Sequence, residues 1–551
     1  MPSDLDRRFD EMLAEVLGPG GRVIAGHDAK GHAVAENLPA TLPGLFRAFC
    51  ALNAQAEGVV AGDERLTFAE LDRISERVAH GLVARGIAKG DRVGIAMRNC
   101  PAWVVTYMAV VKAGAIATLL NGWWEPLEME HAVQLTEPKL IIADPPRATR
   151  ISERCDHSVV LALPIERPVE EAVGDLLTGS ETQLPEILPD DDATILFTSG
   201  STGESKGAIS THRAVTTATY CYSLGLIVLL GLLTKDGRAP SSQPRTLLSV
   251  PLFHVTGEVP VMINSFVVGR CLVIMPKWDA TEALRLIEKE KITYFVGVPT
   301  MSLELLNHPD RHAYDLSSMT DITAGGAPRP VSHVERLIKE FPGAQPAIGY
   351  GLTETNAAGC ANYWGNYAAK PASTGRAQKP FVELAILGDG DRHLNSGEMG
   401  EIAFRSAANI AGYWRNPEAT AALFTADGYI RTGDVGYVDE DGYLFIVDRK
   451  KEIIIRGGEN ISAAEVEAEC YACPDVAEAA VFGAPDERLG EVPIAVIHAS
   501  DGLSEERLRS FLEPRLARFK IPARFIFSPD PLPRLGTGKI DRRALKVQYT
   551  H

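Results

Sequence analysis

The stretch ATILFTSGSTGESKG, Ala193 to Gly207, is the part of the chain from which the predicted fold follows most directly. It begins as the apolar run Ala193 to Phe197 and continues into a loop of glycines and hydroxyl side chains that ends with Lys206. An unbroken apolar run is typical of a strand buried on both faces, as in a parallel sheet. Glycines let backbone N–H groups approach a ligand closely, and hydroxyls and a lysine add donors and charge. The stretch therefore predicts a buried strand that ends at an anion site, with an ordinary surface turn as the alternative.

Further apolar runs extend this pattern along the chain. They occupy residues 92–97, 139–143, 159–163, 245–250, 271–275 and 293–298. Helical patterns separate them, and one helix is predicted to begin at Asp279, three residues before Glu282, as in a capping box. After about residue 380 short strands alternate with Gly/Asp turns, which indicates a small antiparallel sheet or barrel. From Asp448 onward helices and strands mix again.

These patterns predict an α/β protein. We expect a large N-terminal domain of stacked, mostly parallel α/β sheets with a small β-barrel subdomain, residues 1–447. A small α+β C-terminal domain follows, residues 448–551. The length of 551 residues agrees with several structural units rather than one core.

Composition narrows the function classes. The net charge of −17 argues against general binding of nucleic acid or of an anionic membrane. The N-terminus lacks the apolar core of a signal peptide, and the apolar run Leu224 to Leu233 is too short to span a bilayer. Eight cysteines without a signal peptide indicate reduced thiols and a cytoplasmic protein. Cys470 and Cys473 form a lone CxxC pair, interpreted as two small residues on a helix, with a metal or redox role as the less favoured alternative.

The loop after the strand is not a Walker A motif, because the fifth residue after Gly200 is Ser205 rather than Gly. Its order T-S-G-S-T-G-x-x-K-G instead resembles the phosphate loop of the adenylate-forming (ANL) superfamily, which includes acyl-CoA synthetases, peptide-synthetase adenylation domains and luciferases. The other motifs of that superfamily follow in order: AGGAP (324–328), GYGLTET (349–355), YIRTGD (429–434), DRKKEIIIRGGENISAAEVE (448–467) and PRLGTGKI (533–540). Ser205 and Ala463 stand where the family often has proline, which bears only on loop rigidity.

The resemblance implies activation of a carboxylic acid with ATP and Mg²⁺. A carboxylate is a poor electrophile, so the acid attacks the α-phosphate, pyrophosphate leaves, and the acyl adenylate then reacts with a nucleophile. Such an enzyme must neutralise phosphate charge and align the attack.

The resemblance also assigns nucleotide-binding residues. The phosphate loop would contribute Thr198, Ser199, Gly200, Ser201, Thr202, Gly203 and Lys206. The adenine side would be Gly325, Gly326, Ala327 and Pro328, with Tyr350 stacked on the base beside Gly351. Asp434, a carboxylate with two acceptor oxygens, would bind the ribose hydroxyls, and Arg449 would lie near ribose and phosphate.

Four further residues are predicted to act in chemistry. Glu354 is the predicted Mg²⁺ ligand, because Mg²⁺ prefers one or two carboxylates plus phosphate oxygens. Thr353 and Thr355 flank it as hydroxyl donors, with Thr353 at the α-phosphate. Lys539 is the predicted catalytic lysine, its ammonium bridging the carboxylate and the α-phosphate. Outside these motifs a helix-capping glutamate and a solvated lysine would be the ordinary interpretations.

The resemblance implies a mobile C-terminal domain that pivots at Lys451. Its rotation would withdraw Lys539 and bring Gly457 and Gly458 to a path for pantetheine. His254, in PLFHVTG (251–257), is expected to gate the acid site or to orient the carboxylate, with a core histidine as the alternative.

The predicted acceptor is coenzyme A, which makes the chain an AMP-forming acyl-CoA synthetase. Enzymes of the family that activate amino acids usually carry an aspartate where this chain has Val255, so a free amino acid is not expected as the substrate. Apolar residues around the expected pocket favour a medium or long fatty acid, or an aryl or arylalkanoic acid. A stand-alone enzyme that loads a carrier protein and a luciferase-like oxygenase remain alternatives, and a homodimer is open.

Overall fold

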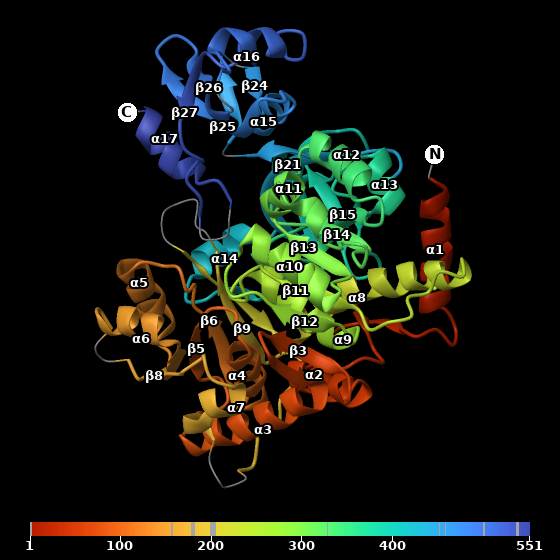
Figure 1. The fold of residues 1–551 in the computed structure, drawn as a ribbon, viewed down its shortest axis with the longest axis vertical. Coiled ribbons are helices and arrows are strands. Elements are labelled where there is room, and N and C mark those ends of the chain that lie inside the picture. The colour runs from red at the N-terminus through yellow and green to blue at the C-terminus, as the bar shows by residue number, and fades with distance from the viewer. Residues whose placement is uncertain are drawn as a thin grey trace.

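The computed structural model describes residues 3–155, 158–177, 182–198, 205–327, 329–450, 452–457, 459–499, 502–535 and 539–550. Two large sheets, one four-stranded sheet and one five-stranded sheet organise these residues (Figure 1). The five-stranded sheet and its helices form a separate unit at the top of Figure 1, above the body that holds the other sheets. The predicted α/β class with a separate C-terminal domain is therefore confirmed.

The first large sheet has seven strands in the order β20-β10-β9-β6-β5-β7-β8. Its strands are β5 (Arg92–Ala96), β6 (Ile116–Leu119), β7 (Leu140–Ala143), β8 (Val160–Ala162), β9 (Asp192–Phe197), β10 (Gly207–Thr211) and β20 (Gly412–Tyr413). The strands from β8 to β9 are parallel, whereas β10 turns back antiparallel to β9 with Gly207 opposite Phe197. The predicted anion loop is consequently the connection of a β-hairpin.

The second large sheet has nine strands in the order β17-β16-β15-β14-β13-β11-β12-β3-β4. Its strands are β3 (Glu57–Ala61), β4 (Glu64–Thr67), β11 (Arg245–Leu248), β12 (Cys271–Ile274), β13 (Tyr294–Gly297), β14 (Asp321–Ala324), β15 (Gln345–Gly351), β16 (Gly359–Tyr363) and β17 (Arg376–Ala377). The strands from β3 to β15 are parallel, and the antiparallel strands lie at the two edges.

Two smaller sheets complete the architecture. The four-stranded antiparallel sheet, in the region predicted as a small sheet or barrel, consists of β18 (Glu383–Leu387), β19 (Gly400–Arg405), β21 (Ile430–Val438) and β22 (Leu444–Arg449). The C-terminal sheet consists of β23 (Ile454–Arg456), β24 (Glu459–Ile461), β25 (Val476–Asp486), β26 (Gly490–Ala499) and β27 (Arg524–Ser528). Near the N-terminus β1 (Ala25–His27) pairs with β2 (Ala33–Ala35). The last two sheets are thus separated in the chain by the end of β22 at Arg449 and the start of β23 at Ile454, close to the predicted boundary.

Helices cover the sheets. In the large body they are α1 (Asp4–Leu17), α2 (Leu42–Leu52), α3 (Phe68–Ala84), α4 (Pro101–Lys112), α5 (Pro126–Thr136), α6 (Pro145–Ser152), α7 (Val169–Ala172), α8 (His212–Lys235), α9 (Asn264–Val267), α10 (Ala280–Glu290), α11 (Pro299–Asn307), α12 (Val331–Glu340), α13 (Trp364–Ala369) and α14 (Pro417–Leu423). The C-terminal unit has α15 (Ala463–Tyr471), α16 (Glu505–Leu512) and α17 (Arg542–Thr550). Short 3-10 helices occupy residues 174–176, 311–313, 353–355 and 389–391, and a π-helix spans Gly257–Ile263.

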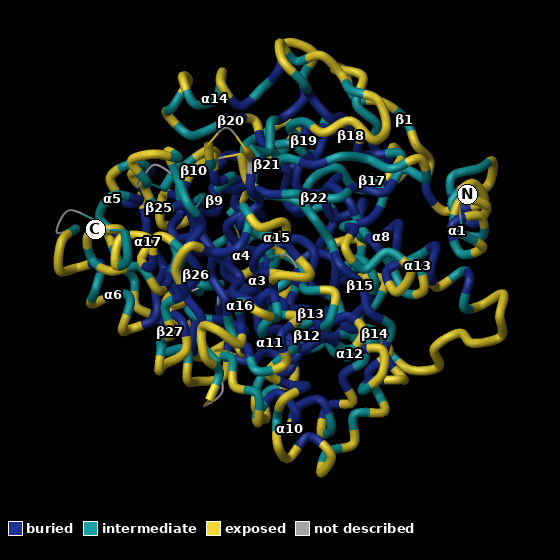
Figure 2. Tube along the Cα trace, turned by 90° about the horizontal axis from the view of Figure 1, so that it is seen from above, coloured by how far each residue is buried: buried dark blue, intermediate teal, exposed yellow. Residues whose placement is uncertain are grey.

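The core lies between the two large sheets. Every residue of α4 is buried, so this helix is apolar all round rather than on one stripe, as expected for an interior helix. Figure 2 shows the buried, dark blue residues concentrated along the strands and the inner helices, with exposed residues at the rim. α8 is long and apolar enough to span a membrane by length and composition, but 72% of its most apolar window is buried inside the protein. It is therefore accounted for as a core helix.

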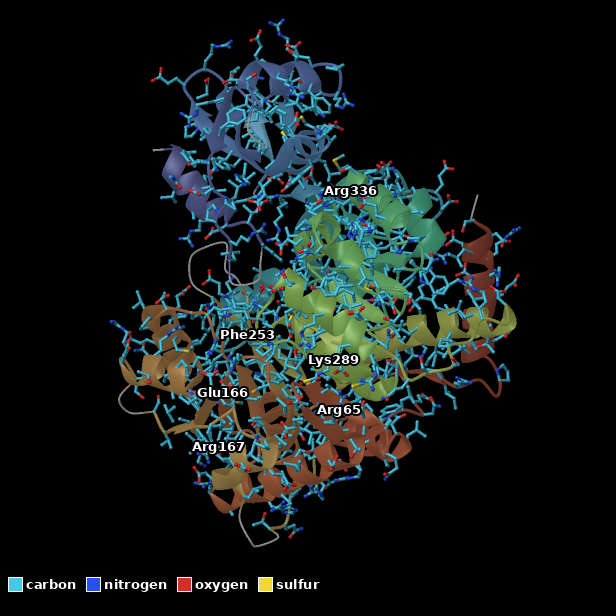
Figure 3. All side chains as sticks on the ribbon, in the orientation of Figure 1. Arg65, Glu166, Arg167, Phe253, Lys289 and Arg336 are labelled. Atoms are coloured by element: carbon cyan, nitrogen blue, oxygen red, sulfur yellow. The ribbon has the colours of Figure 1, made fainter. Side chains whose placement is uncertain are left out.

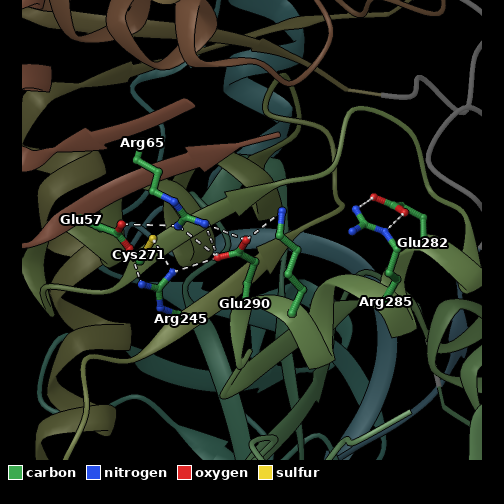
Figure 4. Close-up of polar contacts among 8 residues, drawn as sticks. Glu57, Arg65, Arg245, Cys271, Glu282, Arg285 and Glu290 are labelled. Carbon is green, nitrogen blue, oxygen red and sulfur yellow. Dashed lines mark hydrogen bonds and ion pairs between the residues drawn. The ribbon is translucent and has the colours of Figure 1, made fainter. Parts of the chain in front are cut away.

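A charged network ties the edge hairpin β3–β4 of the second sheet to α10 and β11. Figure 3 places Arg65 and Lys289 near each other, and Figure 4 shows their contacts. Arg65 reaches Glu290 through Nη2–Oε1 and Nη1–Oε2 distances of 3.0 and 3.1 Å, and Arg245 bonds both Glu290 and Glu57. The Glu290 side chain is only 4% exposed. The Arg65 side chain is 41% exposed, so this bidentate pair is only partly shielded from solvent, but it holds β4 against α10 more firmly than a fully exposed pair would.

The helix start predicted at Asp279 is present in part. The Asp279 side chain accepts the backbone N–H of Glu282 at 2.8 Å and caps α10. The Glu282 carboxylate pairs with Arg285 instead of returning to the cap backbone. The capping box is therefore only half formed, because the basic residue three positions on offers the carboxylate a stronger partner.

Candidate active site

The anion loop leaves the first sheet between β9 and β10. The backbone N–H of Thr198 donates to the carbonyl of Lys206 at 3.0 Å and closes the base of the hairpin. His131 on α5 contacts the Ser205 carbonyl through Nε2 at 3.2 Å. The predicted residues Ser199, Gly200, Ser201, Thr202 and Gly203 lie outside the described residues, as do Pro328, Lys451 and Gly458. The two ends of the loop are thus fixed by the sheet and by α5.

Glu354, the predicted metal ligand, belongs to the 3-10 turn Thr353–Thr355 after β15. The Tyr413 hydroxyl donates to its Oε1 at 2.7 Å, and its own carbonyl accepts the N–H of Ile410 at 3.0 Å. The ammonium of Lys206 lies 4.9 Å from the centre of the Tyr413 ring. Tyr413 therefore connects the predicted metal ligand with the predicted phosphate-binding lysine.

The hydrogen bonds of the turn around Glu354 determine which neighbouring side chains have polar groups free to bind a ligand. Thr355 is buried and its hydroxyl donates to the Ala358 carbonyl at 2.6 Å, so the prediction that Thr355 offers a free donor is wrong. Thr353 is half-buried and its carbonyl accepts the N–H of Asn356. A Cβ at Gly351 would lie 2.1 Å from the Ala357 carbonyl, so only glycine permits the chain to fold back so closely here.

Tyr350 and Asp434 form the second part of the site. Asp434 on β21 is buried, and its Oδ2 accepts the Tyr350 hydroxyl at 2.5 Å. Its Oδ1 lies 3.3 Å from Nε of Arg449, at the end of β22. Burial raises the pKa of Asp434, although Arg449 and the Tyr350 hydrogen bond oppose this effect. The geometry brings the predicted adenine and ribose residues together and holds the carboxylate by two partners.

Lys539 reaches this cluster from the C-terminal unit. The segment before α17 descends from that unit to the large body (Figure 1), and Leu535 donates its N–H to the Lys539 carbonyl at 2.8 Å. A Cβ at Gly326, which has a φ of +76°, would lie 3.5 Å from Nζ of Lys539. Burial and the charge of Arg449 lower the pKa of Lys539 to about 8, with Asp434 opposing. The predicted catalytic ammonium therefore lies against the predicted adenine-side loop.

His254 lies close enough to Lys539 for their charges to interact. Burial and the charge of Lys539 lower the pKa of His254 to about 3, so the imidazole is neutral at physiological pH. Its Nε2 is buried without a hydrogen-bond partner among the described residues. A neutral ring whose free nitrogen carries the proton can donate a hydrogen bond to a bound carboxylate, which fits the predicted orienting role.

Gly325 and Ala327 flank Gly326 directly after β14, whereas Gly457 lies apart from this cluster. Gly457 occupies the turn between β23 and β24, where its N–H bonds to the Leu489 carbonyl at 2.7 Å. Lys539 and Gly457 thus lie in different segments of the C-terminal unit, and the structure has Lys539 at the cluster. This is the arrangement expected for the first of two half-reactions.

The donor set fits the ions that the motifs imply. Oε1 of Glu354 accepts from Tyr413, whereas its Oε2 has no hydrogen-bond partner among the described residues, and oxygen is the ligand that Mg²⁺ prefers. Lys206 and Lys539 provide positive charge for phosphate groups. A Mg²⁺ ion held by Glu354 would neutralise charge on the phosphates of a bound nucleotide. Among the described residues no group of three or more His, Cys, Asp and Glu side chains forms a metal cluster, and both Cys470 and Cys473 are buried free thiols.

Sequence patterns alone did not identify Tyr413 as a site residue. It lies in GYW, a segment without a recognised motif, and contacts Glu354 only because β20 joins the first sheet beside β10. Trp123, next to His254, was missed for the same reason: its ring centre lies 6.5 Å from the His254 ring, although the two residues are distant in sequence. The signal available in the sequence was a tryptophan shortly after the apolar segment that forms β6.

The Tyr350–Asp434 pair, the predicted metal ligand Glu354 and the lysine Lys539 fit the chemistry that the motifs predict, which is the joining of AMP to a carboxylic acid. The chain belongs to the AMP-binding enzyme family: the family's sequence model matches residues 46–414, and that of the AMP-binding enzyme C-terminal domain matches residues 465–539.

Named relatives agree with this assignment. The chain is 35% identical over 503 residues to a feruloyl-CoA synthase of Amycolatopsis sp, which covers 90% of this chain and 97% of the relative. It is 33% identical over 493 residues to a long-chain-fatty-acid–CoA ligase of Mycobacterium tuberculosis, covering 89% and 94%. Among solved structures, o-succinylbenzoate coenzyme A synthetase from Bacillus subtilis in complex with ATP and magnesium ion matches with a TM-score of 0.78 and 28% identity, covering 91% of this chain and 99% of that one.

The protein is accordingly an AMP-forming acyl-CoA synthetase, a ligase that uses ATP, Mg²⁺ and coenzyme A. Its substrates are small carboxylic acids.

Proposed function

We propose that this ligase activates a hydrophobic carboxylic acid, either a medium- or long-chain fatty acid or an aryl or arylalkanoic acid, and transfers it to CoA. The observation that carries the proposal is the absence of ionised side chains from two segments beside the site. These are residues 214–234 of α8 and residues 251–267, which include the π-helix; we call them the acid-binding segments.

The acid-binding segments contain two titratable carboxyl or imidazole groups, and both are neutral. His254 is unprotonated at physiological pH because burial lowers its pKa to about 3. Glu258 has no exposed surface, its Oε1 accepts the Tyr107 hydroxyl at 2.6 Å, and burial raises its pKa to about 8. A second carboxylate or an ammonium on the substrate would find no opposite charge here, and burying it unpaired would cost far more than the about 2–7 kcal/mol that an unpaired neutral polar group costs.

The position of α8 supports the same proposal. The Tyr222 hydroxyl donates to the Ala357 carbonyl, beside Glu354, and lies 4.0 Å from a Cβ built on Gly349. The segment that holds Tyr222 therefore faces β15, the strand that carries Tyr350. An acid bound between them meets tyrosine and aliphatic side chains, which gain free energy from covering an apolar tail.

The protein groups would then divide the work of adenylation. The neutral His254 ring orients the carboxylate by a hydrogen bond, and the Lys539 ammonium stabilises negative charge shared by carboxylate and α-phosphate. Tyr350 and Asp434 fix the nucleoside, and Lys206 holds phosphate. Pyrophosphate leaves, and the acyl adenylate remains for attack by the thiol of CoA. The hinge at Lys451, the passage at Gly457 and Gly458 and the domain division at residue 447 belong to this proposal.

A release assay for pyrophosphate tests the proposal. Octanoate, palmitate and ferulate are compared with malonate and glycine, each with and without CoA, and thioester is measured in parallel by mass. We expect release with at least one apolar acid and none with malonate or glycine, and thioester without added carrier protein. The Lys539→Ala variant provides the background. Preference for malonate or glycine would overturn the proposed substrate class while leaving the ligase class intact.

A further inference from the structure

The loop Asn121–Glu125, between β6 and α5, presents a large apolar side chain to solvent. Trp123 is 41% exposed although its neighbour Trp124 is half-buried. The Trp124 ring packs edge-on against Phe197, the last residue of β9, with centroids 5.1 Å apart. The Trp123 ring faces the other way and packs edge-on against Phe253 at 5.0 Å. One tryptophan thus supports the phosphate-loop strand, and the other lies beside the acid-binding segments.

The backbone that carries Trp123 is firmly held. Arg147 donates from Nε to the Gly122 carbonyl at 3.0 Å, and Arg150 donates from Nη1 to the Trp124 carbonyl at 2.8 Å. The Asn121 side chain accepts the N–H of Trp123 at 2.9 Å. A ring on such a backbone is preorganised, so a ligand that covers it does not have to order the loop.

The position of this ring relative to His254 suggests which ligand covers it. The His254 ring centre is 6.5 Å from that of Trp123, and Phe253, labelled in Figure 3, packs against both rings. On the proposed function, the acid and the adenylate lie on the side of His254 that faces Lys539, whose charge acts on the His254 ring. A second substrate that attacks the adenylate has to come from solvent, past exposed groups beside His254. Trp123 is such a group, and it is apolar.

We propose that Trp123, supported by Phe253, is the surface on which the pantetheine arm of CoA lies while its thiol attacks the acyl adenylate. The arm is flexible, uncharged and composed of methylene and amide groups, which pack well on an aromatic face. In the attack the thiolate sulfur bonds to the acyl carbon, AMP leaves with the electron pair of the cleaved C–O bond, and the thiol proton passes to solvent. The inference rests on CoA as the acceptor and not on the identity of the acid.

The test measures the two half-reactions separately in the full-length enzyme. We expect Trp123→Ala to raise the KM for CoA by about tenfold, the loss of one aromatic contact. The KM for the acid and the rate of pyrophosphate release without CoA should change less than twofold. Trp123→Phe should recover most of the CoA affinity. Leu127→Ala removes another exposed apolar side chain from the start of α5 and serves as the matched control, with the KM for CoA unchanged.

A binding signal that is independent of turnover completes the test. Titration of CoA into the enzyme with AMP bound should quench tryptophan fluorescence, and Trp123→Phe should lose most of that quenching while keeping its melting temperature. An unchanged KM for CoA in Trp123→Ala would overturn the inference. An equal rise in the KM for the acid would do so as well, because it would place Trp123 in the acid pocket. Absence of thioester from the wild-type enzyme would instead count against CoA as the acceptor.

Discussion

The ammonium of Lys539 is a positive charge that the C-terminal unit brings to Asp434 and Gly326. Removal of this charge leaves the developing charge between carboxylate and α-phosphate unstabilised. We expect Lys539→Ala to lower acyl-adenylate formation by about 100-fold or more, the usual loss when one such donor is removed. Thioester formation from supplied acyl adenylate should stay within a fewfold of the wild type. Pyrophosphate release and single-turnover thioester assays measure the two steps, and an equal loss in both would contradict separate roles.

The same lysine predicts a pH dependence. Its pKa is lowered from 10.5 to about 8, so the ammonium is lost as the pH rises through about 8 in the free enzyme. The kcat/KM for ATP in adenylation, which reports the free enzyme, should therefore fall above about pH 8. The kcat should fall only at higher pH, because bound phosphates favour the charged form. Profiles of Lys539→Arg, which stays charged, should lack the fall; a fall that persists there would assign it to another group.

Glu258 predicts a pH dependence of stability. Its pKa is raised from 4.5 to about 8 by burial, so the folded protein holds a proton that the unfolded chain releases. Stability falls as the pH rises between these two values. Glu258→Gln removes this effect and should raise the melting temperature by about 5 °C at pH 8.5 but leave it nearly unchanged at pH 5. Tyr107→Phe, which removes the hydroxyl that donates to Glu258, is the matched control. If Glu258→Gln shifted the melting temperature equally at both pH values, the pH dependence could not be assigned to Glu258.

At this scale the sequence predicted residues that belong to contiguous motifs and missed those that meet by folding. Asp434, Glu354 and Lys539 were identified because each lies in a motif whose neighbouring residues serve the same chemistry. Tyr413 and Trp123 had no such neighbours: the first reaches Glu354 through the pairing of β20 with β10, and the second reaches His254 from the end of β6. Such contacts depend on sheet order, which periodicity does not give.

At the scale of elements, α17 is attached to the rest of the C-terminal unit by Arg542. Its guanidinium bonds Glu467 on α15 and reaches Glu452 at 2.9 Å, just after the end of β22. Arg542 lies three residues after Lys539, so these pairs also fix the lysine segment. The Glu467 side chain is only 9% exposed, and burial raises its pKa although Arg542 opposes this.

Removal of Arg542 should loosen both α17 and the Lys539 segment. We expect Arg542→Ala to destabilise the C-terminal unit by about 2 kcal/mol, less than for a fully buried pair because the arginine is partly exposed. Hydrogen exchange in α15 and α17 should accelerate, while exchange in β11–β15 stays unchanged. The double variant Arg542→Met/Glu467→Met leaves no unpaired charge and should recover much of the loss. Faster exchange throughout the chain would contradict a local effect.

The elements themselves followed from the sequence where their signals were local. Parallel strands were recognised from unbroken apolar runs, and the start of α10 from Asp279. The π-helix Gly257–Ile263 was not predicted, because its extra residue per turn is not recorded in any residue pattern. Inside it lie Pro260, which has no N–H to donate, and Glu258, whose carboxyl turns toward Tyr107. This segment, which we propose binds the acid, departs from a regular α-helix. Its backbone geometry depends on contacts with buried neighbours such as Tyr107.

At the scale of the whole molecule, one aromatic contact joins the C-terminal unit to the large body. His333 on α12 and Tyr471 on α15 meet edge to face, with ring centroids 5.9 Å apart. Burial lowers the pKa of His333 to about 4, so the contact is uncharged at neutral pH. If the C-terminal unit turns between half-reactions, as we propose, this contact exists only while Lys539 is at the cluster.

Substitution of His333 should therefore affect the two half-reactions unequally. Loss of an edge-to-face pair costs about 1 kcal/mol, which is about a fivefold change in the population of the adenylating orientation. We expect His333→Ala to lower the single-turnover rate of adenylation by up to this factor and to leave thioester formation from acyl adenylate equal or slightly faster. His333→Phe keeps an aromatic ring and should behave as the wild type. Equal slowing of both half-reactions in His333→Ala would mean that α12 has been disturbed and that the orientation of the C-terminal unit does not depend on this pair.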